Sequence, residues 1–210
     1  MKLVAFSLLA LAETVFAGDR DAPKAPVGVY LEFEHPSSDA ELSLLESEVG
    51  SILGPLGFDL RWRGMDAVGR EVWVDLALVT FRGHCDLASV PPKFDSAAPT
   101  LGETHLVGGK IQPFAKIECD RIGALVKPRL VPVRGQDRER LFQRAIARVV
   151  AHELYHIFAG TAAHESTGLG KAVFTTSDLL SDRLQFDPAQ AHALRQTSAG
   201  DALQLPRYGK

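Results

Sequence analysis

Short runs of apolar residues, some of them alternating with polar ones, indicate β-strands in the first 118 residues of the chain. The last two of these runs are separated by Gly108-Gly109, a strong signal for a hairpin turn. Pro113 in the second run suits an edge or a bulge better than a central strand. The expected strands cover residues 27–33, 58–62, 71–81, 102–107 and 110–118.

Helices are expected where the apolar spacing becomes helical and capping residues precede it. The cluster at 36–39 (PSSD) can cap a first helix. Asp137 is the expected N-cap of a long helix that Gly160 terminates, and Pro128 is expected to end a shorter one before it. The expected helices cover residues 39–53, 119–126, 137–159, 177–186 and 188–197.

This order of elements predicts an α+β domain with a mixed sheet of four or five strands, backed by the two long helices at 39–53 and 137–159. We expect one domain over 18–210. An N-terminal subdomain, 18–160, would include the long helix, and a smaller C-terminal subdomain, 161–210, would be irregular with helical pieces.

The composition is that of an ordinary globular domain. The chain has 210 residues, 46% of them hydrophobic and 23% charged, with a net charge of −3. This slight acidity differs from the positive field of a nucleic-acid binder, and no segment approaches the roughly 20 apolar residues that a membrane span needs. We therefore expect neither nucleic acid nor membrane as a partner. The sequence does not give the oligomeric state, and a monomer is assumed.

Residues 1–17 have the pattern of a cleavable secretory signal. Lys2 provides the positive start, an apolar run follows, and small residues precede a cleavage point after Ala17. The alternative is a buried N-terminal helix. In a secreted or periplasmic protein, Cys85 and Cys119 are expected to form a disulfide, the alternative being a metal ligand or a reactive thiol.

The candidate chemistry lies in residues 152–156 (HELYH). Helix positions four apart lie one turn apart on the same face, so His152 and His156 can direct two imidazoles at one ion. Glu153 lies where its carboxylate can reach a metal-bound water. The flanking residues are apolar on nearly every face, and burying three polar side chains without a partner would cost several kcal/mol. The pattern therefore predicts a zinc site.

A catalytic zinc needs a third protein ligand and one open position. Gly160 can turn the chain sharply, and His164, four residues later, is the expected third ligand. Carboxylates that follow it remain alternatives for this position. They are Glu165, Asp178 and Asp182.

With HELYH followed by Gly160 and His164, the sequence resembles the metzincin clan of zinc metallopeptidases. Their motif has two residues before the glycine and two after it, whereas both spacers here have three. The order of strands and helices over 27–164 is also similar to the metzincin N-terminal subdomain.

Metzincins also carry a methionine in a turn beneath the metal, and this chain departs from them there. Its only methionines, Met1 and Met65, lie upstream of the motif. Residues 168–170 (GLG) are expected to form the corresponding turn, with Leu169 as its apolar floor.

The resemblance implies one catalytic Zn²⁺ held by His152, His156 and His164, with Glu153 as the catalytic residue that activates a zinc-bound water for peptide hydrolysis. It also implies a peptide or protein substrate that lies extended along an edge strand within 101–118. Two alternatives stay open. One is a zinc-stabilised secreted binding or structural protein without turnover, and the other is a zinc amidase acting on cell-wall peptides.

The remaining histidines lack ligand-like spacing and are expected at the surface or in the core. Arginines on and before the first turns of the long helix are expected to form a solvated face, and Tyr155 is expected to pack away from the metal. The histidines are His35, His84, His105 and His192, and the arginines are Arg134, Arg138, Arg140, Arg144 and Arg148.

Overall fold

The computed structural model describes residues 26–91 and 100–200, with side chains up to residue 196. Its centre is a five-stranded mixed sheet in the order β2-β1-β3-β5-β4. Neighbouring strands run parallel except β4, which pairs antiparallel with β5 at one edge. The strands are β1 (Pro26–Phe33), β2 (Asp59–Gly64), β3 (Asp75–Arg82), β4 (Gly102–Val107) and β5 (Lys110–Glu118).

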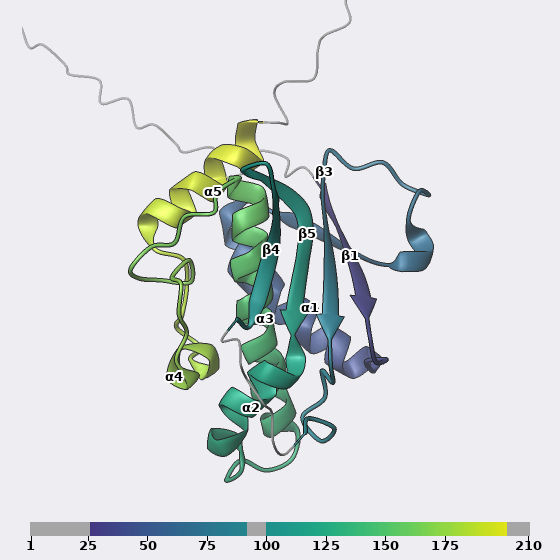
Figure 1. Cartoon of the computed structure of the whole chain (residues 1–210), viewed down its shortest axis with the longest axis vertical. Coiled ribbons are helices and arrows are strands. Elements are labelled where there is room, and N and C mark those ends of the chain that lie inside the picture. The colour runs from purple at the N-terminus through teal and green to yellow at the C-terminus, as the bar shows by residue number, and fades with distance from the viewer. Residues whose placement is uncertain (1–25, 92–99, 201–210) are drawn as a thin grey trace, which may run out of the picture.

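Two long helices, α1 and α3, lie side by side against one face of the sheet, as Figure 1 shows. The prediction of a mixed sheet backed by two helices is thus confirmed. Of the three further helices, α2 lies between β5 and α3 in the chain, and α4 and α5 follow α3. The helices are α1 (Asp39–Leu53), α2 (Cys119–Leu130), α3 (Gln136–Ala159), α4 (Thr176–Leu180) and α5 (Pro188–Gly200), with short 3₁₀ turns η1 (Gly54–Leu56) and η2 (Met65–Ala67).

The first helix begins where its capping residues predict. Ser38 accepts the Glu41 N–H at 3.3 Å, and the Glu41 carboxylate accepts the Ser38 N–H at 2.7 Å, which forms a capping box. Leu45, Val49 and Ile52 of this helix are at most 2% exposed. The predicted span of 39–53 is therefore confirmed.

Two predicted boundaries near the sheet are wrong. The strand expected over 71–81 starts at Asp75, because Asp75 pairs with Val27 at the beginning of β1 and residues 71–74 have no strand to pair with. The helix expected to end before Pro128 continues to Leu130. A proline inside a helix costs about 3 kcal/mol, and the buried side chains of Val126 and Leu130 offset that cost.

The predicted start of α3 and the predicted end of α4 are also wrong. The helix begins at Gln136 with Gly135, at φ 61°, as its N-cap, so Asp137 is not the cap. Asp137 instead lies in the first turn, where a carboxylate is favoured by the helix dipole, and pairs with Arg140 at 3.2 Å. The helix expected over 177–186 ends at Leu180.

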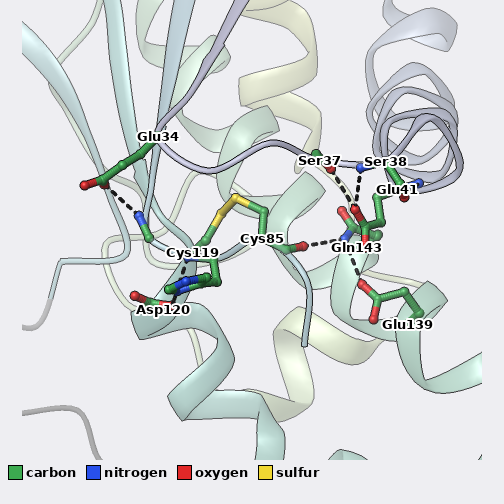
Figure 2. The surroundings of a disulfide bond; sticks show 11 residues. Glu34, Ser37, Ser38, Glu41, Cys85, Cys119, Asp120, Glu139 and Gln143 are labelled. Atoms are coloured by element: carbon green, nitrogen blue, oxygen red, sulfur yellow. Dashed lines mark hydrogen bonds and ion pairs between the residues drawn. A yellow bond between two sulfur atoms is a disulfide. The ribbon is translucent and has the colours of Figure 1, made fainter. Parts of the chain in front are cut away.

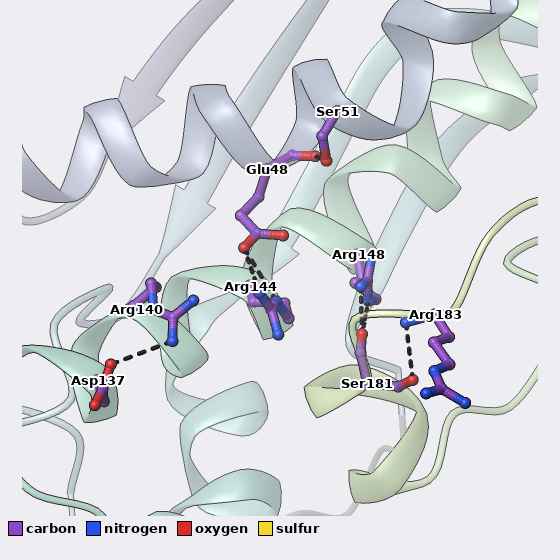
Figure 3. Close-up of polar contacts among 8 residues, drawn as sticks. All are labelled: Glu48, Ser51, Asp137, Arg140, Arg144, Arg148, Ser181 and Arg183. Carbon is purple, nitrogen blue, oxygen red and sulfur yellow. Dashed lines mark hydrogen bonds and ion pairs between the residues drawn. The ribbon is translucent and has the colours of Figure 1, made fainter.

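The helix at 176–180 ends early because Arg148 holds the backbone that follows it. The Arg148 guanidinium donates twice to the Ser181 carbonyl oxygen, as Figure 3 shows. Arg148 is 2% exposed and Arg144 pairs with Glu48 at 3.0 Å between α3 and α1. The prediction of a solvated arginine face is therefore wrong for these two arginines, which join elements instead.

The predicted disulfide between Cys85 and Cys119 is present (Figure 2). It ties the loop after β3 to the first residue of α2, and both cysteines are buried. The Gln143 amide of α3 donates to the Cys85 carbonyl oxygen at 2.7 Å and to Glu139 at 2.9 Å. Sheet, α2 and α3 thus meet at one buried point.

Across the described ranges, no helix combines the length and the apolar character that crossing a bilayer requires. The predicted signal at 1–17 lies outside the described residues.

The disulfide between Cys85 and Cys119 closes a loop of 34 residues. Replacing both cysteines by serine should therefore lower the free energy of unfolding by about 3–4 kcal/mol. Denaturant unfolding of wild type and the double variant measures this difference. Thiol labelling of the unreduced, denatured wild-type protein should find no free thiol, and two labelled cysteines per chain would contradict the bond.

Candidate metal centre

Helix α3 places three polar side chains in an apolar interior near its C-terminal end. His152, Glu153 and His156 are each at most 5% exposed. The two imidazoles lie one helical turn apart, as predicted, with ring centroids separated by 4.6 Å. Buried polar groups of this kind need partners, because leaving them unsatisfied is costly.

Both imidazoles direct their Nδ1 atoms at backbone carbonyl groups. His152 Nδ1 lies 2.8 Å from the Leu169 oxygen, and His156 Nδ1 lies 2.7 Å from the Thr161 oxygen. A carbonyl oxygen can only accept, so Nδ1 carries the proton and Nε2 of the neutral ring carries a lone pair. The two Nε2 atoms are nevertheless only 3.0 Å apart. This arrangement is stable only when something positive lies beside both nitrogens.

The third histidine returns to the first two through the turn that ends α3. Gly160 adopts φ 59°, in the left-handed region that glycine favours, and terminates the helix as predicted. His164 Nε2 then lies 3.2 Å from His156 Nε2, and the His164 ring stacks on that of His152. The ligand atoms of the three histidines all lie within 4.8 Å of one another.

The alternative carboxylates do not join this cluster. In the part of the chain that the structure describes, these three histidines are the only group of potential ligands close enough to hold an ion. Asp178 accepts the Thr175 N–H in the capping box of α4 and pairs with Lys171 at 2.7 Å. Glu165 and Asp182 are exposed and lie outside the cluster.

This donor set fits a zinc ion. With Zn–N bonds of about 2.0–2.1 Å, nitrogens at the corners of a tetrahedron lie about 3.3 Å apart. The distances of His156 Nε2 from the Nε2 atoms of His152 and His164, 3.0 and 3.2 Å, are close to this value. Burial lowers the pKa of His152 to about 4 and also lowers the pKa of His156. Protonation therefore does not relieve the facing lone pairs near neutral pH, whereas a cation does.

The predicted turn at residues 168–170 lies against His152. Gly168 has φ 66°, and Leu169 is fully buried. The Leu169 carbonyl oxygen accepts the His152 proton, while its N–H donates to the Gln185 carbonyl at 2.9 Å. The turn thus supplies the acceptor that fixes one candidate ligand, a role beyond the apolar floor expected from the sequence.

Glu153 is held by the edge strand β4. Thr104 Oγ1 donates to Glu153 Oε2 at 2.6 Å. A Cβ added at Gly102 would lie 2.5 Å from Glu153 Oε1 and 2.8 Å from Val149, so this close approach requires glycine. Burial raises the pKa of Glu153 to about 7, and the Thr104 hydrogen bond opposes that rise.

Sequence reasoning does not identify Thr104 or Gly102 as residues of this site. Their spacing of two places them on the same face of the predicted edge strand, which is a usable signal. The sequence does not say, however, that this face packs on α3 rather than on another element.

A cleft of about 730 Å³ runs past the histidines, and β4 forms one wall. Most of the lining is apolar, and it comes from β4 and the residues before it, from β5, α2 and α3, and from the segments on both sides of His164. The apolar side chains include Leu101, Leu106, Ile111, Ala124, Leu125, Val149, Ala162, Ala172, Val173 and Phe174. The cleft therefore combines a polar centre with walls that favour apolar groups.

The other predicted non-ligands lie outside the cluster, as expected. His84 Nδ1 lies 3.3 Å from Asp120, and the His84 ring stacks on His35. His105 contacts the Phe114 ring and His192 contacts Gln196. Tyr155 is 4% exposed and packs against Phe186, which confirms its predicted packing role.

In metal-free protein, His152 should stay neutral until the pH falls to about 4, because burial opposes its charged form. Its stabilising contribution is then fully present above about pH 6.5 and lost as the pH falls through about 4. The pKa of Glu153 is raised, so the contribution of Glu153 to the free energy of unfolding falls as the pH rises from about 4.5 to 7. An NMR titration of the imidazole therefore tests His152 better than global stability does. A pKa of His152 near the ordinary value of about 6.5 in the folded protein would contradict the expected effect of burial.

No protein-family model and no characterised protein sequence matches this chain. Among solved structures, the chain is similar to archaemetzincin from Methanopyrus kandleri, with a TM-score of 0.48 and 11% sequence identity. The match covers 84% of this chain and 96% of that chain. What this chain does is therefore inferred from its own side chains.

Proposed function

We propose that this chain is an exported zinc-dependent peptidase, with His152, His156 and His164 as metal ligands and Glu153 as the catalytic residue. One observation carries the proposal. The Nε2 atoms of three imidazoles gather at one point, 3.0 Å apart for His152 and His156 and 3.2 Å apart for His156 and His164, next to a buried carboxylate in an open cleft. A purely structural zinc site is closed by protein ligands and has no use for that carboxylate.

Zinc bound there would lower the pKa of a coordinated water toward 7 and polarise a substrate carbonyl. Glu153 would take the proton from the water and pass it to the leaving amine. Without metal, burial raises the pKa of Glu153 to about 7, and the positive charge of a bound zinc would lower it, which favours the carboxylate form that accepts the proton. Thr104 engages Oε2 and keeps the carboxylate oriented between the two transfers.

An extended peptide fits this cleft better than a compact amide does. β4 is the last strand of the sheet and lies along the cleft, so its outer edge offers backbone groups for pairing with a substrate strand. The apolar walls around it favour substrates with apolar side chains near the cleaved bond.

Export is supported by two features. A disulfide such as that between Cys85 and Cys119 is typical of oxidising compartments, and residues 1–17 have the pattern of a cleavable signal. The proposed location is therefore the periplasm or the extracellular space.

Replacing Glu153 by Gln should lower turnover of a quenched peptide library by at least about 100-fold, because the proton acceptor is lost, while the zinc content stays at the wild-type level. Glu139→Gln is the matched control. Glu139 lies on the same helix, and burial also raises its pKa. It accepts a hydrogen bond from Gln143 beside the disulfide, however, and not at the metal centre.

Full activity of Glu153→Gln would overturn the proposed mechanism. Zinc binding with no chelator-sensitive cleavage of any peptide or unfolded protein would favour a zinc-stabilised binding or structural protein. Cleavage confined to cell-wall peptides would favour the amidase.

A further inference from the structure

Gln190 is a buried side chain that hydrogen-bonds to the backbone on both sides of the Leu169 turn and to the backbone of Asp187, just before α5. It lies near the start of α5 and is 1% exposed. Its Oε1 accepts the N–H groups of Gly170 at 3.1 Å and Asp187 at 3.0 Å, and its Nε2 donates to the Thr167 carbonyl oxygen at 3.0 Å. Because the amide oxygen accepts hydrogen bonds while the amide nitrogen donates one, this side chain holds the backbone segments that it bridges in place.

The residues that Gln190 holds flank the acceptor of His152. Thr167 and Gly170 enclose the two-residue step Gly168-Leu169, and the Leu169 carbonyl oxygen accepts the His152 Nδ1 proton at 2.8 Å. The packing is close enough that a Cβ added at Gly170 would lie 2.7 Å from Gln190 Nε2. The direction of the Leu169 carbonyl is thus set from both sides by one amide.

This turn needs such a constraint because two of its three residues are glycines. Glycine backbones have the widest conformational choice, so the segment loses more entropy on folding than one with side chains. The buried Leu169 side chain fills space, but apolar contacts are non-directional and do not aim a carbonyl. The hydrogen bonds of Gln190 are directional, and removing them leaves the buried N–H of Gly170 unsatisfied.

We infer that Gln190 is a positioning residue of the metal centre. By fixing the turn around Leu169, it fixes the orientation and the Nδ1 tautomer of His152 and so raises the affinity of the three-histidine site for zinc. This inference rests on the metal centre proposed above. Groups that orient metal-bound imidazoles typically contribute 10–100-fold to metal affinity.

The test compares Gln190→Leu with Gln143→Leu. Gln143 is an equally buried amide, 2% exposed, but its hydrogen bonds go to Cys85 and Glu139 beside the disulfide. Both variants should lose stability, since each leaves buried polar groups unpaired. Only Gln190→Leu should bind zinc about 10–100-fold more weakly in competition with a chromophoric chelator, and only it should change the visible absorption spectrum of the Co²⁺-substituted protein.

Equal zinc affinities and equal cobalt spectra in the two variants would overturn the inference. If Gln190→Leu does not fold, Gln190→Glu decides. It keeps the Oε1 acceptor but places an oxygen opposite the Thr167 carbonyl, so zinc binding should still weaken, and wild-type affinity there would overturn the inference. A wild-type protein that binds no zinc would instead refute the proposed metal centre itself.

Discussion

Two backbone carbonyl groups impose the constraint on which the site depends. The oxygens of Leu169 and Thr161 accept the Nδ1 protons of His152 and His156, which leaves both Nε2 lone pairs facing each other at 3.0 Å. Burial keeps His152 from relieving this by protonation near neutral pH, since its pKa is lowered to about 4. A cation is the partner that satisfies such an arrangement in a buried site.

Much of the surrounding structure serves to hold these few atoms. α3 is buried against the sheet and α1, and Arg148, one turn before His152, fixes the backbone after α4 through the Ser181 carbonyl. That fixed segment leads to Gln185, whose carbonyl oxygen accepts a hydrogen bond from the Leu169 N–H. From the other side, β4 contacts Glu153 through Gly102 and Thr104. The candidate ligand His152 is thus oriented by the segments that follow α3, and the candidate base Glu153 by the edge strand β4.

The sequence was sufficient to predict the elements and the motif but not the contacts that orient it. The strands at 102–107 and 110–118 and the helix at 39–53 were predictable because their turn and capping signals are local. The approach of His164 to the other two histidines was predictable because Gly160 marks a sharp turn four residues earlier. Arg148 could not be distinguished from the solvated arginines near it, since its partner is a backbone carbonyl 33 residues away. Thr104 and Gln190 were missed for the same reason.

The most direct test of the metal centre is the zinc content of the purified, dialysed protein beside that of His164→Ala. His164 is the right residue to change because it is exposed and comes from outside the helix that carries the other two histidines. Its loss should therefore leave the fold intact. The proposed centre predicts one zinc ion per wild-type chain and a large loss in the variant, with both proteins folded. A wild-type protein that holds no zinc, or a variant that holds it as tightly as wild type, would contradict it.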